Sequence, residues 1–152
     1  ASVTFGKYNT ASNYCSAAFG NSTLATGEHS FAEGSGSRAE GSMSHAEGWG
    51  ARACGRGSHA EGQSTETTNE CEHAQGRFNM SHAHTIDSIG IGNNTDDRRN
   101  ATEVTDDGKM YVLGIGNYNG RNTGASGVKD LASEFHWLQT RIAELEAKLG
   151  GK

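Results

Sequence analysis

Every seventh residue from Gly6 to Gly76 is glycine, apart from Asn13 and Asn69. Two positions earlier runs a second column, which is alanine apart from Thr4 and Thr67. A seven-residue unit that approximates Ser-x-Ala-x-Gly-x-x is therefore repeated in register eleven times between residues 2 and 78. A flexible Gly/Ser linker would not be expected to keep a fixed repeat over eleven units. An internal repeat of fixed length constrains the architecture more than any other sequence signal.

The two asparagines suggest a role for the glycine column. Asparagine is the residue other than glycine that best tolerates a positive φ. A column of glycine with occasional asparagine therefore predicts a left-handed backbone turn at the same point of every unit.

The spacing of seven is not that of a coiled coil here, because the recurring residues are Ser, Ala and Gly instead of large apolar side chains. In a strand, the first, third and fifth residues of each unit face one side, and their small size predicts a narrow interior. Alternate units differ at the second and fourth residues, so the full period is fourteen. Two strands per coil predict a mainly β fold, a flattened parallel β-solenoid with 14-residue coils.

Composition limits what else the chain can be. Only 33% of the residues are hydrophobic, so thin stacked coils or oligomerisation must supply the missing burial. A net charge of −5 does not indicate the basic surface that nucleic-acid binding requires. No apolar run is long enough to predict membrane insertion. Cys15 and Cys71 would lie four coils apart, roughly 19 Å, beyond disulfide reach. We therefore expect Cys15, Cys54 and Cys71 to be free thiols.

The segments Ser2-Val3-Thr4-Phe5-Gly6 and Ser16-Ala17-Ala18-Phe19-Gly20 resemble the head repeats of trimeric autotransporter adhesins, which are left-handed parallel β-rolls. Ser-His-Ala-Glu-Gly at 44–48 and 58–62 departs from that pattern and is similar to repeats of phage and prophage fibre proteins. The resemblance covers residues 2–78 and implies a homotrimer. It implies that Val3, Phe5, Ala17, Phe19 and Phe31 line the trimer interior.

Polar residues continue the same face of the repeat. His45, His59 and His73 recur every fourteen residues, with Glu47 and Glu61 following two positions after the first two. We expect them to pair across subunits in the trimer interior; the alternative is a solvated polar ladder. Buried pairs of this kind must be fully hydrogen-bonded.

The period breaks after residue 78. Residues 79–127 predict a small β module, with Asp106-Asp107-Gly108 as a hairpin turn, similar to modules near the ends of phage tail fibres. From residue 128 to 149 the apolar spacing predicts a trimeric coiled coil, or alternatively one amphipathic helix folded back on the chain. Its core positions are Val128, Leu131, Phe135, Leu138, Ile142, Leu145 and Leu149.

A metal site is also predicted in the β module. Alternation along an extended segment would place His82 and His84 on one face. Three copies around a threefold axis would offer six nitrogens to iron or another first-row transition metal, as in the His-x-His tips of phage fibres. The alternative is a hydrogen-bonded or solvated histidine pair.

These observations predict a structural and adhesive homotrimer, a phage or prophage tail-fibre component located in the virion. Its partners would be other fibre proteins and a host-surface glycan or protein. The runner-up is the head fragment of a bacterial trimeric autotransporter adhesin at the cell surface. Trp49, Arg38 and Arg52 are the candidate receptor-binding residues, because Trp and Arg are enriched at binding hot spots. No unique nucleophile, base and acid stand out, so we expect no enzyme.

Overall fold

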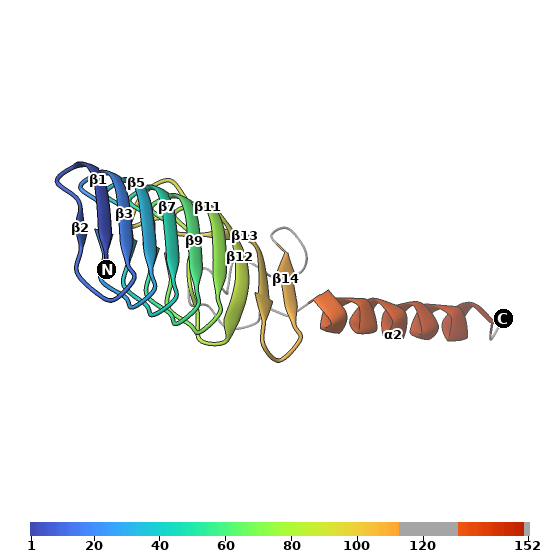
Figure 1. The fold of residues 1–152 in the computed structure, drawn as a ribbon. Coiled ribbons are helices and arrows are strands. Elements are labelled where there is room, and N and C mark those ends of the chain that lie inside the picture. Colours follow the sequence, from blue (N-terminus) through green and yellow to red (C-terminus); the bar gives the residue numbers. More distant parts are fainter. Residues whose placement is uncertain (113–130, 151–152) are drawn as a thin grey trace.

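The computed structural model describes residues 1–112 and 131–150, and the repeats form a parallel β-solenoid (Figure 1). Each of the six coils contains one long strand, and the first five also contain one short strand. The long strands are β1 (Val3–Lys7), β3 (Ala17–Asn21), β5 (Phe31–Ser35), β7 (His45–Trp49), β9 (His59–Gln63) and β11 (His73–Arg77). The short strands are β2 (Thr10–Ala11), β4 (Leu24–Ala25), β6 (Arg38–Ala39), β8 (Arg52–Ala53) and β10 (Glu66–Thr67). The predicted parallel solenoid with 14-residue spacing is confirmed.

Consecutive coils pair in parallel without a register shift. Ala18 pairs with Ala32, and Ala32 with Ala46, so one alanine column runs through the core. A second column, which includes Ala25, Ala39 and Ala53, comes from the short strands. All of these alanines are fully buried. Because these interior side chains are small, the two sheets lie close together and the interior is thin.

The serine that directly precedes each of the strands β3, β5, β7 and β9 donates a hydrogen bond to the backbone of the preceding turn. The Ser30 hydroxyl donates to the carbonyl of Gly27 at 2.6 Å, and the Ser44 hydroxyl donates to Gly41 at 2.6 Å. Both serines are buried. A buried carbonyl without a donor would be costly, so a small hydroxyl residue suits this position.

Close approach to the next coil constrains every glycine of the column, because a Cβ there would lie 2.4 Å or less from a backbone oxygen. A positive φ is added only in part of the column, so the prediction of a uniform left-handed turn is wrong. Gly20 has a φ of 122°, whereas Gly27, Asn13 and Asn69 have no positive φ. At Gly27 the constraint is close approach, because a Cβ there would lie 1.9 Å from the carbonyl oxygen of Gly41.

The left-handed residue common to every unit lies two positions after the glycine column. Its φ values range from 43° to 69°. The residues are Tyr8, Cys15, Ser22, His29, Gly36, Met43, Gly50, Gly57, Ser64, Cys71 and Phe78. The turn is set by stacking of the coils, because most of these side chains do not favour a positive φ by themselves.

After the repeats, β12 (Thr85–Ile91) adds to the same sheet, parallel to β11. Strands β13 (Asn100–Thr105) and β14 (Met110–Val112) follow in antiparallel order, joined by the hairpin predicted at residues 106–108. The interior here is polar instead of alanine-lined. Glu72, Asn79, Asn100 and Glu103 are fully buried.

The chain then forms helix α2 (Leu131–Gly150). Predicted core residues Phe135, Leu138, Ile142, Leu145 and Leu149 are all exposed in the single chain, between 46% and 73%. Val128 lies outside the described residues, and Leu131 begins the helix. Within the described part of the chain, α2 does not have the length and apolarity needed to cross a bilayer.

Candidate functional site

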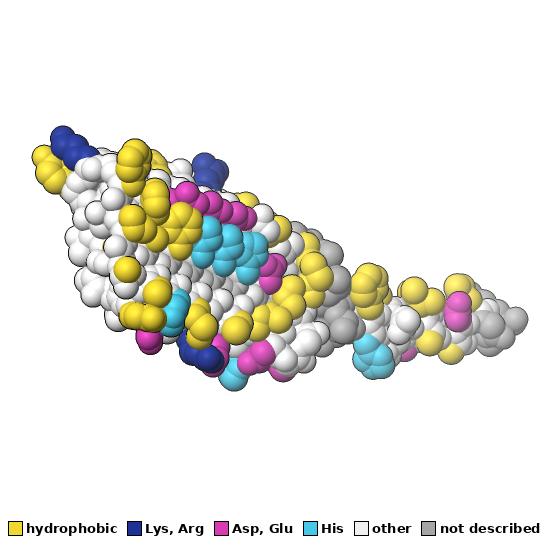
Figure 2. All heavy atoms as spheres, viewed as in Figure 1, with side chains coloured by type: hydrophobic (Ala, Val, Ile, Leu, Met, Phe, Trp, Pro, Cys, Tyr) yellow, Lys and Arg dark blue, Asp and Glu magenta, His cyan; other side chains and the backbone are white. Residues whose placement is uncertain are grey.

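The most distinctive surface of the solenoid is a ladder of neighbouring rings on the outer face of the long strands. We call it the ring ladder: Phe5, Phe19, Phe31, His45, His59 and His73. Successive ring centroids are 4.5 to 6.2 Å apart. Figure 2 shows the histidines as a cyan stripe that continues an apolar yellow patch. Phe31, His45, His59 and His73 are second residues of their units, and the parallel register places each beside the next. Phe5 and Phe19 instead occupy the fourth position, which Glu33 continues, so Phe19 meets Phe31 diagonally.

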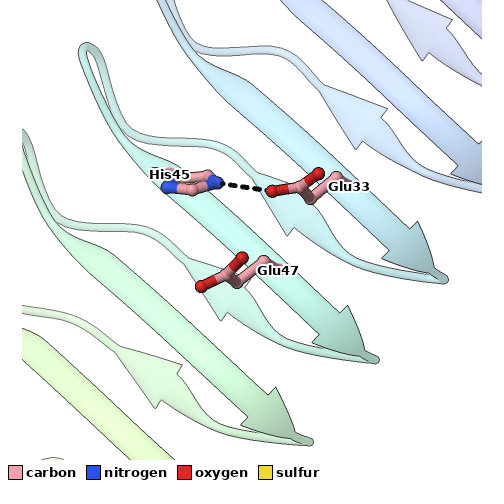
Figure 3. A group of neighbouring side chains, drawn as sticks. All are labelled: Glu33, His45 and Glu47. Atoms are coloured by element: carbon pink, nitrogen blue, oxygen red, sulfur yellow. Dashed lines mark ion pairs between the residues drawn. The ribbon is translucent and has the colours of Figure 1, made fainter.

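A row of carboxylates runs alongside the histidines. The Nε2 atom of His45 lies 3.4 Å from Glu33 Oε1, and that of His59 lies 3.5 Å from Glu47 Oε1. His73 Nε2 lies 3.6 Å from Glu61 Oε1. Each histidine thus reaches back to the carboxylate of the preceding coil. Figure 3 shows this relationship for Glu33, His45 and Glu47.

Two histidine nitrogens in this row are incompletely satisfied. The Nε2 atoms of His45 and His59 are inaccessible to solvent and have no hydrogen-bond partner among the described residues. The carboxylates at 3.4 and 3.5 Å are near enough for an ion pair but lack hydrogen-bond geometry. Buried nitrogens of this kind usually find a partner.

The same atoms form two groups that could hold a metal ion. In one group, donor atoms of Glu33, His45 and Glu47 all lie within 4.8 Å of one another; in the other, those of Glu47, His59 and Glu61 do. Glu47 belongs to both. Imidazole nitrogen with carboxylate oxygen is a donor set that suits divalent zinc and its neighbours.

The electrostatics favour the protonation states that ligation requires. Burial, followed by the neighbouring imidazoles of His45 and His73, lowers the pKa of His59 below 6.5. Burial acts to raise the pKa of Glu47, but the neighbouring side chains of Glu61 and His45 outweigh it and lower that pKa below 4.5. At neutral pH the imidazole is neutral and the Glu47 carboxyl is ionised.

The apolar end of the ladder is exposed in the single chain. Phe5 is 73% exposed and Val3 51%, while Phe19, Phe31 and the three histidines are half-buried. The predicted interior residues therefore share one outward face of β1 to β11. The pairing across subunits stays a prediction.

The structure corrects the local conformation expected around His82 and His84. The segment is a turn instead of an extended strand, closed by a hydrogen bond from Thr85 N to His82 O, and His84 has a φ of 72°. His82 Nδ1 lies 3.0 Å from buried Glu103, whereas His84 Nδ1 lies 3.1 Å from exposed Asp106. In one chain the two imidazoles therefore contact different carboxylates.

The predicted receptor-binding residues occupy different parts of the coil. Arg38 and Arg52 pair side by side on β6 and β8, whereas Trp49 ends β7 and is 64% exposed. Arg52 donates to Glu40 at 2.8 and 3.1 Å and to Glu66 at 3.1 Å. Its guanidinium is thus engaged within the chain, while Trp49 presents its ring to solvent.

Sequence reasoning missed three acidic residues of these networks. Asp87 lies 3.0 Å from His73 Nδ1 and completes the ladder on β12; its spacing of fourteen from His73 was the available signal. Glu72 stands directly before β11, where the other long strands are preceded by serine, and this difference was the available signal. Nothing in the sequence marks Glu103 as buried.

The three free cysteines are confirmed, with Cys15 and Cys71 exposed and Cys54 half-buried. No protein-family model, curated protein or solved structure matches this chain.

Proposed function

We propose that this chain is a structural and adhesive homotrimer, a component of a phage or prophage tail fibre. One observation carries the proposal: two separate elements each leave an apolar stripe without a partner in the single chain. The first is the aromatic end of the ring ladder, and the second is the seam of α2. The resemblance of the repeats to trimeric adhesin heads supports the same conclusion.

The two stripes call for the same kind of partner. A helix in a protein gains most of its stability from packing of its apolar face, and a seam at coiled-coil spacing, such as that of the 20-residue α2, is stabilised by copies of itself. Exposed phenylalanines on the ladder also gain from burial, at about 25 cal/mol per Å² of apolar surface. A threefold assembly along the fibre axis buries both.

The adhesive role rests on avidity. A rigid trimer presents three copies of each surface loop, so a weak contact becomes a strong attachment. Trp49 is the best anchor in one chain, because its ring is exposed whereas Arg52 is held by Glu40 and Glu66.

The metal cage proposed for His82 and His84 requires three chains, because each chain supplies only part of the ligand set. His82 is held by Glu103, and a ligating imidazole commonly has such a carboxylate on its other nitrogen. Iron or another first-row metal would then be bound by the remaining nitrogens of three chains. Native mass spectrometry tests this by comparison: the wild-type trimer should hold one transition-metal ion more than the trimer of His82→Asn/His84→Asn, and equal metal contents overturn the cage.

The oligomeric state is tested by light scattering after size exclusion. We expect three times the 16.0 kDa chain mass. Ile142→Asn, in the seam, should lower that mass, while Ala147→Asn, on the outer face of the same helix, should not. A monomeric wild-type chain overturns the proposal.

Adhesion is tested by flow cytometry of labelled protein on a panel of bacterial strains. Binding to at least one strain is expected, and Trp49→Ala should abolish it. Met43→Ala, which removes another exposed apolar side chain from a turn, is the matched control. Absence of binding to every strain overturns the adhesive part of the proposal.

A further inference from the structure

We infer that the histidine end of the ring ladder is a binding site for one divalent transition-metal ion of the zinc type, held by Glu33, His45, Glu47, His59 and Glu61. This site is distinct from His82 and His84. It is complete within one chain, so it does not depend on the trimer.

The first argument is the donor set. Each histidine is flanked by two carboxylates, one from its own strand and one from the preceding coil, with donor atoms within 4.8 Å of one another. One imidazole nitrogen and two carboxylate oxygens are three protein ligands, which leaves a fourth position for water or substrate in tetrahedral zinc. Calcium and magnesium prefer sites built only from oxygen.

The second argument is the unsatisfied nitrogens. The Nε2 atoms of His45 and His59 are hidden from solvent and accept or donate no hydrogen bond among the described residues, yet both lie beside carboxylates. A metal ion between nitrogen and oxygen would satisfy both groups. His73 differs, because its Nδ1 pairs with Asp87 at 3.0 Å.

The third argument is the way the pattern ends. Phe31 precedes the histidines in the ladder, and Gln75 follows Glu61 in the carboxylate row. Among the described residues, a histidine with both carboxylates therefore occurs only at His45 and His59. An amide at Gln75 carries no charge, so His73 lacks the carboxylate on its own strand that Glu47 gives His45 and Glu61 gives His59.

The two donor groups share Glu47, and adjacent coils are about 4.8 Å apart, so two dications would repel strongly. We therefore expect one ion per chain. Glu47 is the residue on which either position depends.

Isothermal titration of zinc chloride into untagged, EDTA-treated full-length protein at pH 7.5 tests the inference. Saturable binding of one ion per chain is expected, with no comparable heat from magnesium chloride. Glu47→Gln and the double variant His45→Asn/His59→Asn should each weaken zinc binding at least tenfold. The double variant His82→Asn/His84→Asn should bind zinc as the wild type does.

A gain-of-function variant guards against misfolding as the explanation. Gln75→Glu would give His73 the same two flanking carboxylates as His59, and we expect the stoichiometry to rise from one ion to two. Zinc should also raise the unfolding temperature of the wild type and leave that of Glu47→Gln unchanged. Circular dichroism confirms that each variant keeps its β structure.

Two results overturn the inference: zinc binding unaffected by Glu47→Gln and by His45→Asn/His59→Asn, or zinc binding abolished by His82→Asn/His84→Asn. A monomeric chain that still binds zinc would refute the trimer and leave this inference in place.

Discussion

The imidazoles of His45 and His59 stack almost parallel, with 4.5 Å between ring centroids and 8° between ring planes. They do so because they occupy the same position in consecutive coils of a parallel sheet. Identical residues are thereby placed in contact, which is favourable for neutral rings and unfavourable for two positive charges.

The stability of the solenoid should therefore fall as pH decreases. The pKa of His59 is lowered in the folded chain, chiefly by burial, so the unfolded chain binds this proton first. The stability from neutral His59 is present above pH 6.5 and is lost as pH falls through the lowered pKa. Unfolding temperatures at pH 7.5, 6.5 and 5.5 should fall less steeply in His59→Gln. His136→Gln, an exposed histidine on α2, should keep the wild-type slope; equal slopes in all three proteins would contradict the assignment.

Buried Glu72 should show the opposite trend. Its Oε2 accepts hydrogen bonds from Thr68 N at 2.8 Å, Asn69 N at 2.9 Å and Ser81 Oγ at 2.9 Å, while burial raises its pKa above 4.5. A raised pKa means that stability is lost as pH rises through it. The unfolding temperature of Glu72→Gln should thus rise relative to that of the wild type as pH increases from 4.5 to 8. A difference independent of pH would show that this carboxyl does not titrate in the range.

Two glycines that are only two residues apart should respond very differently to alanine. A Cβ at Gly34 would lie 2.1 Å from the backbone oxygen of Gly48, whereas a Cβ at Gly36 has no atom within 4 Å. Gly36→Ala should cost about 1 kcal/mol, from its positive φ alone. Gly34→Ala must separate two coils and should cost more than about 4 kcal/mol or prevent folding. Chemical denaturation measures both, and similar losses would refute the close-approach explanation.

The three thiols should react at two distinct rates. Burial, opposed by nearby Arg52 and reinforced by Glu40 and Glu66, raises the pKa of Cys54 to about 11. At pH 8 this thiol is protonated and unreactive, because the thiolate is the nucleophile. Titration with a disulfide reagent should show two fast thiols, Cys15 and Cys71, and a third that reacts only on unfolding. Cys54→Ser should remove the slow phase alone; three equal rates would contradict the raised pKa.

The sequence was sufficient for the stacking of the coils. In a parallel sheet with a fixed period, residues one period apart lie side by side, so the alanine core and the histidine row follow from spacing alone. The free cysteines follow from the same geometry. The hairpin at residues 106–108 follows from local turn chemistry, with Gly108 at a φ of 79°.

Only the tertiary structure decided which backbone positions are left-handed. The left-handed position of each unit holds Tyr8, Met43 and Phe78 as well as glycines, so residue type did not mark it. The tertiary structure also decided that His82 and His84 leave the strand and contact Glu103 and Asp106, which are more than twenty residues away. Spacing along the chain predicts neighbours one coil apart. It carries no information about contacts made where the period ends, because there packing between segments determines the conformation of each.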